Sequence, residues 1–170
     1  MKTFYLLRHA KSSWSDESLD DFERPLAPRG AKAAPRVATY MKAEGWIPDV
    51  VLCSAARRAV ETLELISPVL GLDSSARIDR DLYLAEPEIM LQRLRGLPDT
   101  AASVLMIGHN PGAETVARRL CGDGRQKAVR RLHKKYPTAA LAVLTFPTDS
   151  WAQITEGSGH LEAFVRPKDL

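Results

Sequence analysis

Apolar runs and segments of helical pattern alternate along the chain. Short apolar runs bounded by turn residues are typical of strands buried inside a sheet. Four such runs stand at residues 3–7, 49–53, 104–107 and 140–146, and weaker ones at 151–155 and 160–165 are expected to add an edge hairpin. Strands that alternate with helices predict a mostly parallel sheet covered on both faces, which is a three-layer α/β sandwich.

Capping residues set the expected helix boundaries. One helix is expected over 29–44, closed by Gly45, and Pro35 inside it predicts either a kink or a later start. A second helix is expected to run from a Ser54 cap to about Leu70, just before a glycine.

Two further helices are expected to begin at prolines. Glu86-Pro87 opens one of them, with a glycine past its end, and Asn110 is expected as N-cap of the other, with Pro111 at its first position. The segment 10–28 is polar and acidic and ends in two prolines, so we expect a long loop there.

Composition predicts one globular domain over residues 1–170. The length is that of a single domain, and neither a repeat nor a shift in composition marks a boundary. Hydrophobic residues make up 45% and charged residues 26%, which excludes a collagen-like or largely disordered chain. No apolar run approaches the ~18 residues of a membrane span, and the apolar stretch at the start is too short for a signal peptide. We therefore expect a cytoplasmic protein that does not associate with membranes.

The charge balance is mildly basic, at 24 − 21 = +3. Such an excess favours anionic small molecules or acidic partner surfaces and does not require nucleic acid. Basic residues concentrate in 118–135, where eight of them stand against one acidic residue, Asp123. A solvated helix face and loop is the favoured interpretation, and a docking surface for an acidic partner protein is the alternative. Nucleic acid is not expected, because aromatic residues are not interleaved with the basic ones.

Cysteine and histidine spacing gives no sign of a metal site. Cys53 and Cys121 form no CxxC pair and match no zinc spacing, and a disulfide is not expected in a cytosolic chain. The chain has no HExxH motif and no carboxylate cluster with the spacing of metal ligands, so we expect no metal and no cofactor. His133 and His160 stand in no motif and are expected as surface or strand residues.

Charged or polar pairs stand where three of the predicted strands give way to a loop or helix. The pairs are Arg8-His9, Arg57-Arg58 and His109-Asn110. In an open α/β sheet the ligand lies outside the carboxyl ends of the strands, so we expect the three pairs to converge. Two of them also stand beside predicted helix N-termini, whose free N–H groups favour anions.

Arginine and histidine converging in this way describe a phosphate pocket. Arginine offers planar, two-pronged hydrogen bonds to phosphoryl oxygens, and histidine can act as a base or be phosphorylated itself. Lys11-Ser12 looks like the end of a P-loop, but no glycine precedes it at the required spacing. The residues therefore indicate metal-free phosphoryl transfer through a histidine.

Four motifs give the chain a resemblance to a known family. They are Leu6-Leu7-Arg8-His9-Ala10, Arg24-Pro25-Leu26 with Arg29-Gly30, Ser54-Ala55-Ala56-Arg57-Arg58-Ala59-Val60-Glu61-Thr62, and Ile107-Gly108-His109-Asn110-Pro111-Gly112. In this order they resemble the histidine phosphatase superfamily, which has a phosphoglycerate-mutase-like fold. Within it, the chain is most similar to the small SixA-type phosphohistidine phosphatases.

The resemblance implies a role for each central residue. His9 would be the nucleophile that carries the phosphoryl group, and Arg8 and Arg58 would clamp the phosphoryl oxygens. His109 would donate to the phosphoryl group in the transition state. Arg58 is selected because the family's arginine precedes an Ala-x-x-Thr sequence, as Arg58 does, and Arg57 is expected to point elsewhere.

Lys11, Ser12 and Arg24 are further candidates for binding the phosphate. The alternative for Lys11 and Ser12 is a solvated loop, and the alternative for Arg24 is an ion pair with the acidic residues of its own loop. Ala10 stands where the family has glycine and adds a methyl group beside the phosphate, which should fit if its φ is negative.

The chain shows no clear general acid. Glu86 and Asp16 are the nearest candidates, and Glu86 is better explained as a residue at a helix start. Imidazole leaves a phosphorylated histidine more easily than an alkoxide leaves an alcohol phosphate, because the ring takes a proton near neutral pH. We therefore expect the substrate to be phosphohistidine on a partner protein, such as a histidine-phosphorylated signalling protein.

Three alternatives stay open. A small-molecule phosphomonoester phosphatase or mutase of the same superfamily tends to carry longer insertions, for which 170 residues leave little room. A phosphate-binding domain without turnover has no use for a nucleophilic histidine. A cysteine-dependent phosphatase needs Cys-x5-Arg, and the residue that follows Cys53 at this spacing is Ala59.

Overall fold

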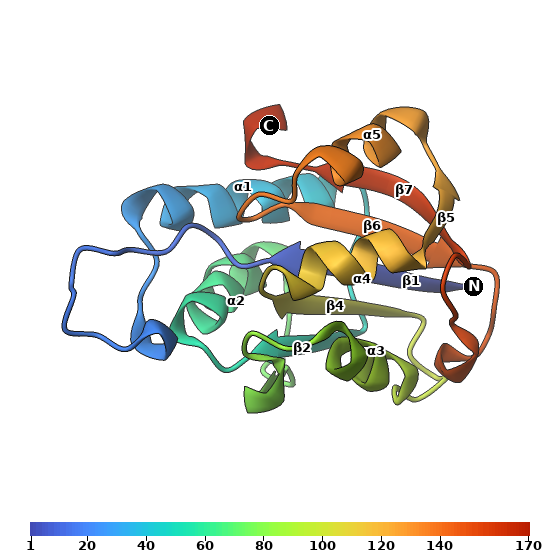
Figure 1. Ribbon diagram of the computed structural model, residues 1–170, viewed down its shortest axis with the longest axis horizontal. Helices are drawn as coiled ribbons and strands as arrows, with labels where there is room; N and C mark the ends of the chain where they lie inside the picture. The colour runs from blue at the N-terminus through green and yellow to red at the C-terminus, as the bar shows by residue number, and fades with distance from the viewer.

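The computed structural model describes residues 1–170 and contains one sheet of seven strands, in the order β3-β2-β4-β1-β6-β7-β5 (Figure 1). The strands are β1 (Lys2–Arg8), β2 (Val50–Ser54), β3 (Arg77–Asp79), β4 (Ser103–Gly108), β5 (Cys121–Gly124), β6 (Leu141–Phe146) and β7 (Gly159–Val165). The four buried runs predicted from the sequence are β1, β2, β4 and β6, each within one residue at either end.

One strand alone runs against the others. β1, β2, β3 and β4 are parallel neighbours, and β5 is parallel to β7. β6 is antiparallel to both β1 and β7. The sheet is therefore mostly parallel, as predicted, and β1, β2 and β4 end on the same side of the molecule, at the left in Figure 1.

Five helices cover the sheet. They are α1 (Pro28–Ala43), α2 (Arg57–Leu70), α3 (Pro87–Arg95), α4 (Gly112–Leu120) and α5 (Gln126–Lys134). α1 and α2 pack on one face, and α3, α4 and α5 pack on the other. This confirms the predicted three-layer α/β architecture. None of these helices combines the length and the apolar character needed to cross a membrane.

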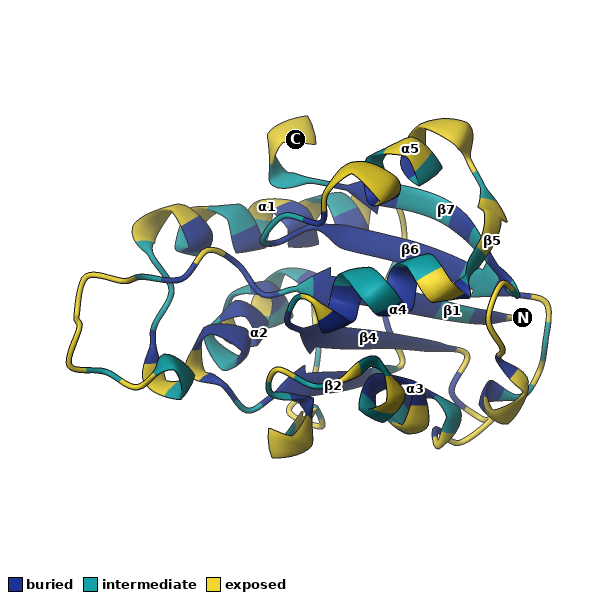
Figure 2. Cartoon of the chain, in the orientation of Figure 1, coloured by how far each residue is buried: buried dark blue, intermediate teal, exposed yellow.

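The central strand β1 contributes to the core on both faces. Phe4 and Leu6 belong to the buried cluster under α3, α4 and α5, whereas Tyr5 and Leu7 belong to the cluster under α1 and α2. Figure 2 shows the central strands buried along most of their length. Full burial of a large apolar side chain contributes about 1.5–3 kcal/mol. A continuous apolar strand is therefore stabilised best where helices cover both faces of the sheet.

Two helix starts differ from the capping predictions. Ser54 is the last residue of β2 and not an N-cap, and its hydroxyl accepts the Ala56 N–H at 3.2 Å while Ala56 itself precedes α2. Pro111, and not Asn110, precedes the first residue of α4. The Asn110 side chain still accepts the Glu114 N–H at 3.2 Å, so it satisfies one of the free donors of that helix.

Helix α1 starts early and includes its internal proline. It begins at Pro28 and continues through Pro35, so the expectation of a later start is wrong. Proline removes one helical hydrogen bond. Burial of Ala34, Val37 and Met41 on the same helix against the sheet and α2 offsets that loss.

The predicted edge hairpin is wrong in its first half. Residues 151–153 form a short 3₁₀ turn instead of a strand, because the Trp151 indole is buried and donates to the Ala101 carbonyl at 2.9 Å. The second half is β7, which lies between β6 and β5 and not at the edge. The edge strands β3 and β5 escaped prediction, since β3 is three mostly exposed residues and β5 is the glycine-rich Cys-Gly-Asp-Gly.

Candidate active site

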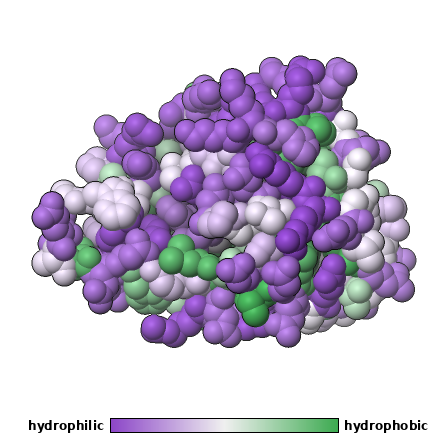
Figure 3. Space-filling model, in the orientation of Figure 1, coloured by the Kyte–Doolittle hydropathy of each residue, from purple (hydrophilic) through white to green (hydrophobic).

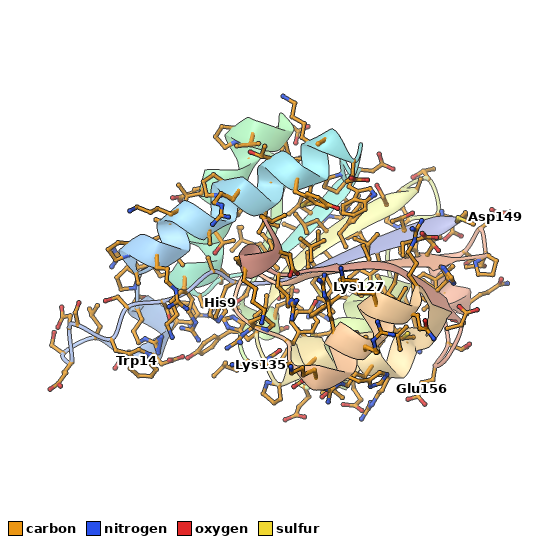
Figure 4. The ribbon with its side chains drawn as sticks, turned by 90° about the horizontal axis from the view of Figure 1, so that it is seen from above. His9, Trp14, Lys127, Lys135, Asp149 and Glu156 are labelled. Carbon is orange, nitrogen blue, oxygen red and sulfur yellow. The ribbon has the colours of Figure 1, made fainter.

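The residue pairs singled out in the sequence converge at the carboxyl end of the sheet. Arg8 ends β1 and His9 follows it, Arg58 lies in the first turn of α2, and His109 follows β4. With residues of the loop after β1 they line a pocket of about 220 Å³. Figure 4 shows His9 toward the same end of the molecule as Trp14.

The two ring nitrogens of His9 have different partners. Nδ1 lies 2.7 Å from the carbonyl oxygen of Ala10, which can only accept, so Nδ1 carries a proton. Nε2 accepts a hydrogen bond from Nε of Arg58 at 3.3 Å and therefore carries a lone pair. Burial lowers the pKa of His9 to about 3, against the hydrogen bond to Ala10 and with the help of nearby arginines. His9 is thus neutral at pH 7, with Nε2 in the state that a nucleophile needs.

Ala10 is buried at the position where the family has glycine. Its φ is not positive, so the methyl group fits, and this methyl group packs in the cluster under α1 and α2. Its N–H donates to the Thr62 hydroxyl at 3.0 Å, and that hydroxyl donates to the Arg58 carbonyl at 2.7 Å. Thr62 therefore ties the peptide that orients His9 to the helix that carries Arg58.

Arg58 is also bound to the loop after β1. Its terminal nitrogens donate to the carbonyl of Asp21 at 2.7 Å and to its carboxylate at 3.0 Å. The carboxylate also accepts from Arg24 at 3.1 Å and from the Tyr83 hydroxyl. Burial raises the pKa of Asp21, but the Tyr83 hydrogen bond and the two arginines outweigh it, and the pKa lies below its ordinary value. Asp21 is therefore an ionised carboxylate held on the arginines of the pocket.

Arg8 reaches the pocket from the end of β1. Its Nη1 donates to the Tyr136 carbonyl at 3.0 Å, which also accepts from the Asn110 side chain at 3.0 Å. The backbone behind it is fixed by Ala139, whose left-handed conformation (φ 60°) points one N–H at the carbonyls of both Arg8 and His9, 3.0 Å away. A non-glycine residue in this conformation is uncommon, and here it fixes the peptide of the Arg8-His9 pair.

The second histidine lies beside the first, with the ring centroids of His9 and His109 5.1 Å apart. Nε2 of His109 lies 2.7 Å from the Ser54 hydroxyl, which already accepts the Ala56 N–H. In the arrangement where Ser54 donates to Nε2, the neutral ring carries its proton on Nδ1. Burial lowers the pKa of His109 to about 3, and His9 and Arg58 lower it further, so this ring is also neutral at pH 7.

Two nitrogens of these residues are buried without any partner. They are Nε of Arg8 and Nδ1 of His109. An unpaired buried donor costs about 1–3 kcal/mol. Both residues line the pocket beside His9, and a phosphoryl oxygen would give each nitrogen an acceptor. The site therefore brings an unprotonated histidine nitrogen, unpaired donors and positive charge together in one small pocket.

The three further candidates for phosphate binding also line the pocket. Lys11 is exposed at its mouth, and the Ser12 hydroxyl accepts from Arg24. The Arg24 guanidinium lies 3.4 Å from the ring centre of Trp14 and pairs with Asp21. Arg24 thus has both the pocket position and the ion pair that the sequence suggested.

Other residues considered in the sequence lie outside the pocket. Glu86 is exposed at the start of α3, and Asp16 is exposed in the loop after β1. Arg57 points away and pairs with Glu61 at 2.9 Å. Burial raises the pKa of Cys53 to about 12, so its thiol is not the thiolate that a cysteine-dependent phosphatase needs.

Sequence reasoning missed several groups that shape the pocket. Nothing in the sequence distinguished Asp21 from the four other acidic residues of its loop, and Ser54 was predicted to be a helix cap. Tyr83 and Tyr136 had no local signal, because their contacts join segments far apart in the chain. Thr62 was visible only as the last residue of its motif.

Comparisons with known proteins identify the family of the chain. Residues 4–103 match the family model described as histidine phosphatase superfamily (branch 1). An uncharacterized protein of Mycobacterium tuberculosis is 35% identical over 164 residues, covering 95% of this chain and 100% of its own. Phosphohistidine phosphatase SixA of Escherichia coli is 29% identical over 119 residues, covering 69% of this chain and 73% of its own. A structure of protein histidine phosphatase SixA complexed with tungstate has a TM-score of 0.80 at 25% identity and covers 98% of both chains.

The chain belongs to the histidine phosphatase superfamily, with the phosphoglycerate-mutase-like fold of that class. Within the superfamily it resembles the SixA type, in sequence and along nearly its whole length in structure. It is therefore a phosphatase that acts on a phosphate-bearing substrate.

Proposed function

We propose that this phosphatase hydrolyses phosphohistidine on a partner protein through an intermediate in which His9 carries the phosphoryl group. The observation that carries the proposal is the state of His9 Nε2, which is buried, unprotonated and held 3.3 Å from Nε of Arg58. The similarity to an Escherichia coli protein named as a phosphohistidine phosphatase supports the same substrate class.

The proposed reaction has two displacements at phosphorus. In the first, the lone pair of His9 Nε2 attacks and the P–N bond of the substrate breaks. Its electron pair stays on the substrate imidazole, which takes a proton from water. In the second, water attacks the phosphorylated His9, gives up a proton to solvent, and inorganic phosphate leaves as the P–N bond to Nε2 breaks. Arg8 and Arg58 hold the phosphoryl oxygens in both steps, and Nδ1 of His109 donates to one of them.

The protonation state of the pocket favours an imidazole leaving group. Asp21 is the carboxyl group that lines the pocket, and the arginines and Tyr83 keep it ionised. An alkoxide would need a protonated acid at that place, whereas imidazole takes a proton readily near neutral pH. Phosphohistidine therefore suits the pocket better than an alcohol phosphate does.

Metal independence is part of the proposal. Arginine and lysine side chains supply positive charge for the phosphoryl group, from Arg8, Lys11, Arg24 and Arg58. We expect turnover to be unchanged after treatment with EDTA. A loss of turnover that a divalent cation restores would overturn this part of the proposal.

The test compares phosphate release from a histidine-phosphorylated phosphotransfer protein with release from an alcohol phosphate, using wild type and His9→Ala. We expect preference for the phosphohistidine protein and loss of turnover in the variant. A His9-dependent preference for the alcohol phosphate would move the substrate to small metabolites. Release of phosphate by His9→Ala at the wild-type rate would overturn the role of His9.

A further inference from the structure

The basic segment 118–135 does not form one surface. It was expected as a helix face and loop, but it contains the end of α4, the strand β5 and the helix α5. Arg118 pairs with Glu114 at 2.8 Å and Arg119 with Glu88 at 2.9 Å, so both charges are used locally. The end of α5, in contrast, contributes to a groove with basic residues from other parts of the chain.

This basic groove has a volume of about 610 Å³. It lies between the first half of α1, the end of α5 and the C-terminal segment 166–170. Lys11 and Thr138 line both the groove and the active-site pocket, so the two cavities adjoin. Figure 4 shows Lys135 toward the same end of the molecule as His9, and Figure 3 shows hydrophilic residues gathered over α5 and the C-terminal segment.

Most of the positive charge in the groove is unpaired. Six of its cations are exposed and take part in no ion pair, and they are Lys11, Arg29, Lys32, Lys134, Lys135 and Lys168. The carboxylate of Asp169 is already shared by Arg131 and Arg166, at 3.1 and 2.7 Å. Arg36 donates to the Leu170 carbonyl. Crowded like charges repel one another, and an anionic partner would relieve that repulsion.

The arrangement of these charges fits an acidic polypeptide. They come from the loop after β1, from α1, from the end of α5 and from the C-terminal segment, so a segment with several carboxylates can contact them together. The groove lining contains no aromatic side chain on which nucleic-acid bases could stack. A polypeptide in the groove would reach the pocket at Lys11 and Thr138 and bring a neighbouring residue close to His9.

We propose that the basic groove docks an acidic segment of the protein whose phosphorylated histidine enters the pocket. This rests on the proposed function and adds the chemistry by which the enzyme selects its partner. Docking outside the pocket strengthens substrate binding without changing the displacement at phosphorus, so it acts on KM and not on kcat.

The test uses two peptides with the same phosphohistidine, one with several glutamates beside it and one with glutamines at the same positions. Free phosphohistidine is the third substrate. The groove variant is Lys32→Glu with Lys168→Glu, both exposed, unpaired and away from His9. The control variant, Lys42→Glu with Arg77→Glu, makes the same charge change at exposed positions outside the groove.

We expect wild type and control to prefer the glutamate peptide by about tenfold in kcat/KM, a preference that added salt weakens. The groove variant is expected to lose it through KM, with free phosphohistidine turned over as by wild type. Equal use of both peptides by wild type, or an unchanged preference in the groove variant, would overturn the docking proposal alone. If the groove variant keeps the peptide preference but loses binding of a single-stranded oligonucleotide, the groove binds nucleic acid and the docking proposal is overturned. No turnover of any substrate by wild type would overturn the proposed function, and the docking proposal with it.

Discussion

Among individual residues, burial sets the protonation state of the two histidines in the pocket. His9 and His109 lie side by side, surrounded by arginines, and neither forms a hydrogen bond with a carboxylate. Their pKa values fall to about 3, so both rings stay neutral far below pH 6.5. The proposed nucleophile, His9, is therefore available without a base to deprotonate it, and the fold loses stability when these rings are forced to take up protons.

This gives a pH dependence with a definite sign. Because the pKa of His9 is lower in the folded protein than in the unfolded chain, the unfolded chain binds more protons between pH 6.5 and 3. Stability is then full above pH 6.5 and falls as the pH drops toward 3, by up to about 1.4 kcal/mol per pH unit for each histidine. We expect His9→Asn to make the fall of Tm between neutral and acid pH shallower than in wild type. His133→Asn, at an exposed position, is the control, and an equal slope in all three proteins would contradict this assignment.

Asp21 binds arginines that we propose hold the phosphoryl group. Its carboxylate accepts from Arg24 and Arg58, both of which line the pocket. We expect Asp21→Asn to bind tungstate about three- to tenfold more tightly, because one negative charge is removed. The effect is limited by solvent, since 42% of the Asp21 side chain is exposed.

Inhibition by tungstate at pH 7 measures this change. Asp20→Asn removes the same charge from the neighbouring exposed position and is expected to have little effect. Weaker tungstate binding by Asp21→Asn would show instead that the carboxylate holds the arginines in their productive positions.

At the scale of elements, the start of α1 packs directly on the backbone that follows His9. A Cβ at Gly30 would lie 2.2 Å from the carbonyl oxygen of Lys11, and that carbonyl also accepts the Ala27 N–H at 2.9 Å. The helix and the loop can approach this closely only because residue 30 has no side chain. Gly30 thus contributes to the pocket by letting α1 approach the backbone after His9, although it supplies no functional group itself.

We expect Gly30→Ala to destabilise the protein by about 1–3 kcal/mol, because the loop backbone must move. Turnover should fall as well, since Lys11 is two residues from His9. Urea unfolding measures the first effect and phosphate release the second. Lys42→Ala, at an exposed site on the same helix, should change neither. Wild-type stability in Gly30→Ala would contradict the close approach.

Across the entire fold, helices cover both faces of the sheet, so adjacent residues of β1 both contribute to the stability of the core. Leu6 is 0% exposed in one cluster and Leu7 is 1% exposed in the other. In a sheet with one solvated face, one of two adjacent positions would tolerate truncation. Here we expect Leu6→Ala and Leu7→Ala each to cost about 2–5 kcal/mol of unfolding free energy. Urea unfolding at pH 7 tests this, and a small cost at either position would contradict a core on both faces.

The sequence predicted the elements whose signals are local. The apolar runs of β1, β2, β4 and β6 and the proline start of α3 are read from a few adjacent residues. The short strands β3 and β5 could not be found in this way, because the sheet beside them, and not their own sequence, makes them strands. Ser54 was misjudged for a similar reason, since its hydroxyl is oriented by His109, 55 positions along the chain.

The fold class and the residues of the pocket could be predicted from the sequence alone, because Arg8, His9, Arg58 and His109 lie at strand or helix ends that a parallel sheet brings together. The folded arrangement alone sets which nitrogen of His9 is free, since that depends on the Ala10 carbonyl and the Arg58 guanidinium. It also decided where the basic residues gather, because charges from distant segments add only when folding brings them to one surface. Motifs are local in sequence, whereas protonation and surface charge depend on neighbours in space.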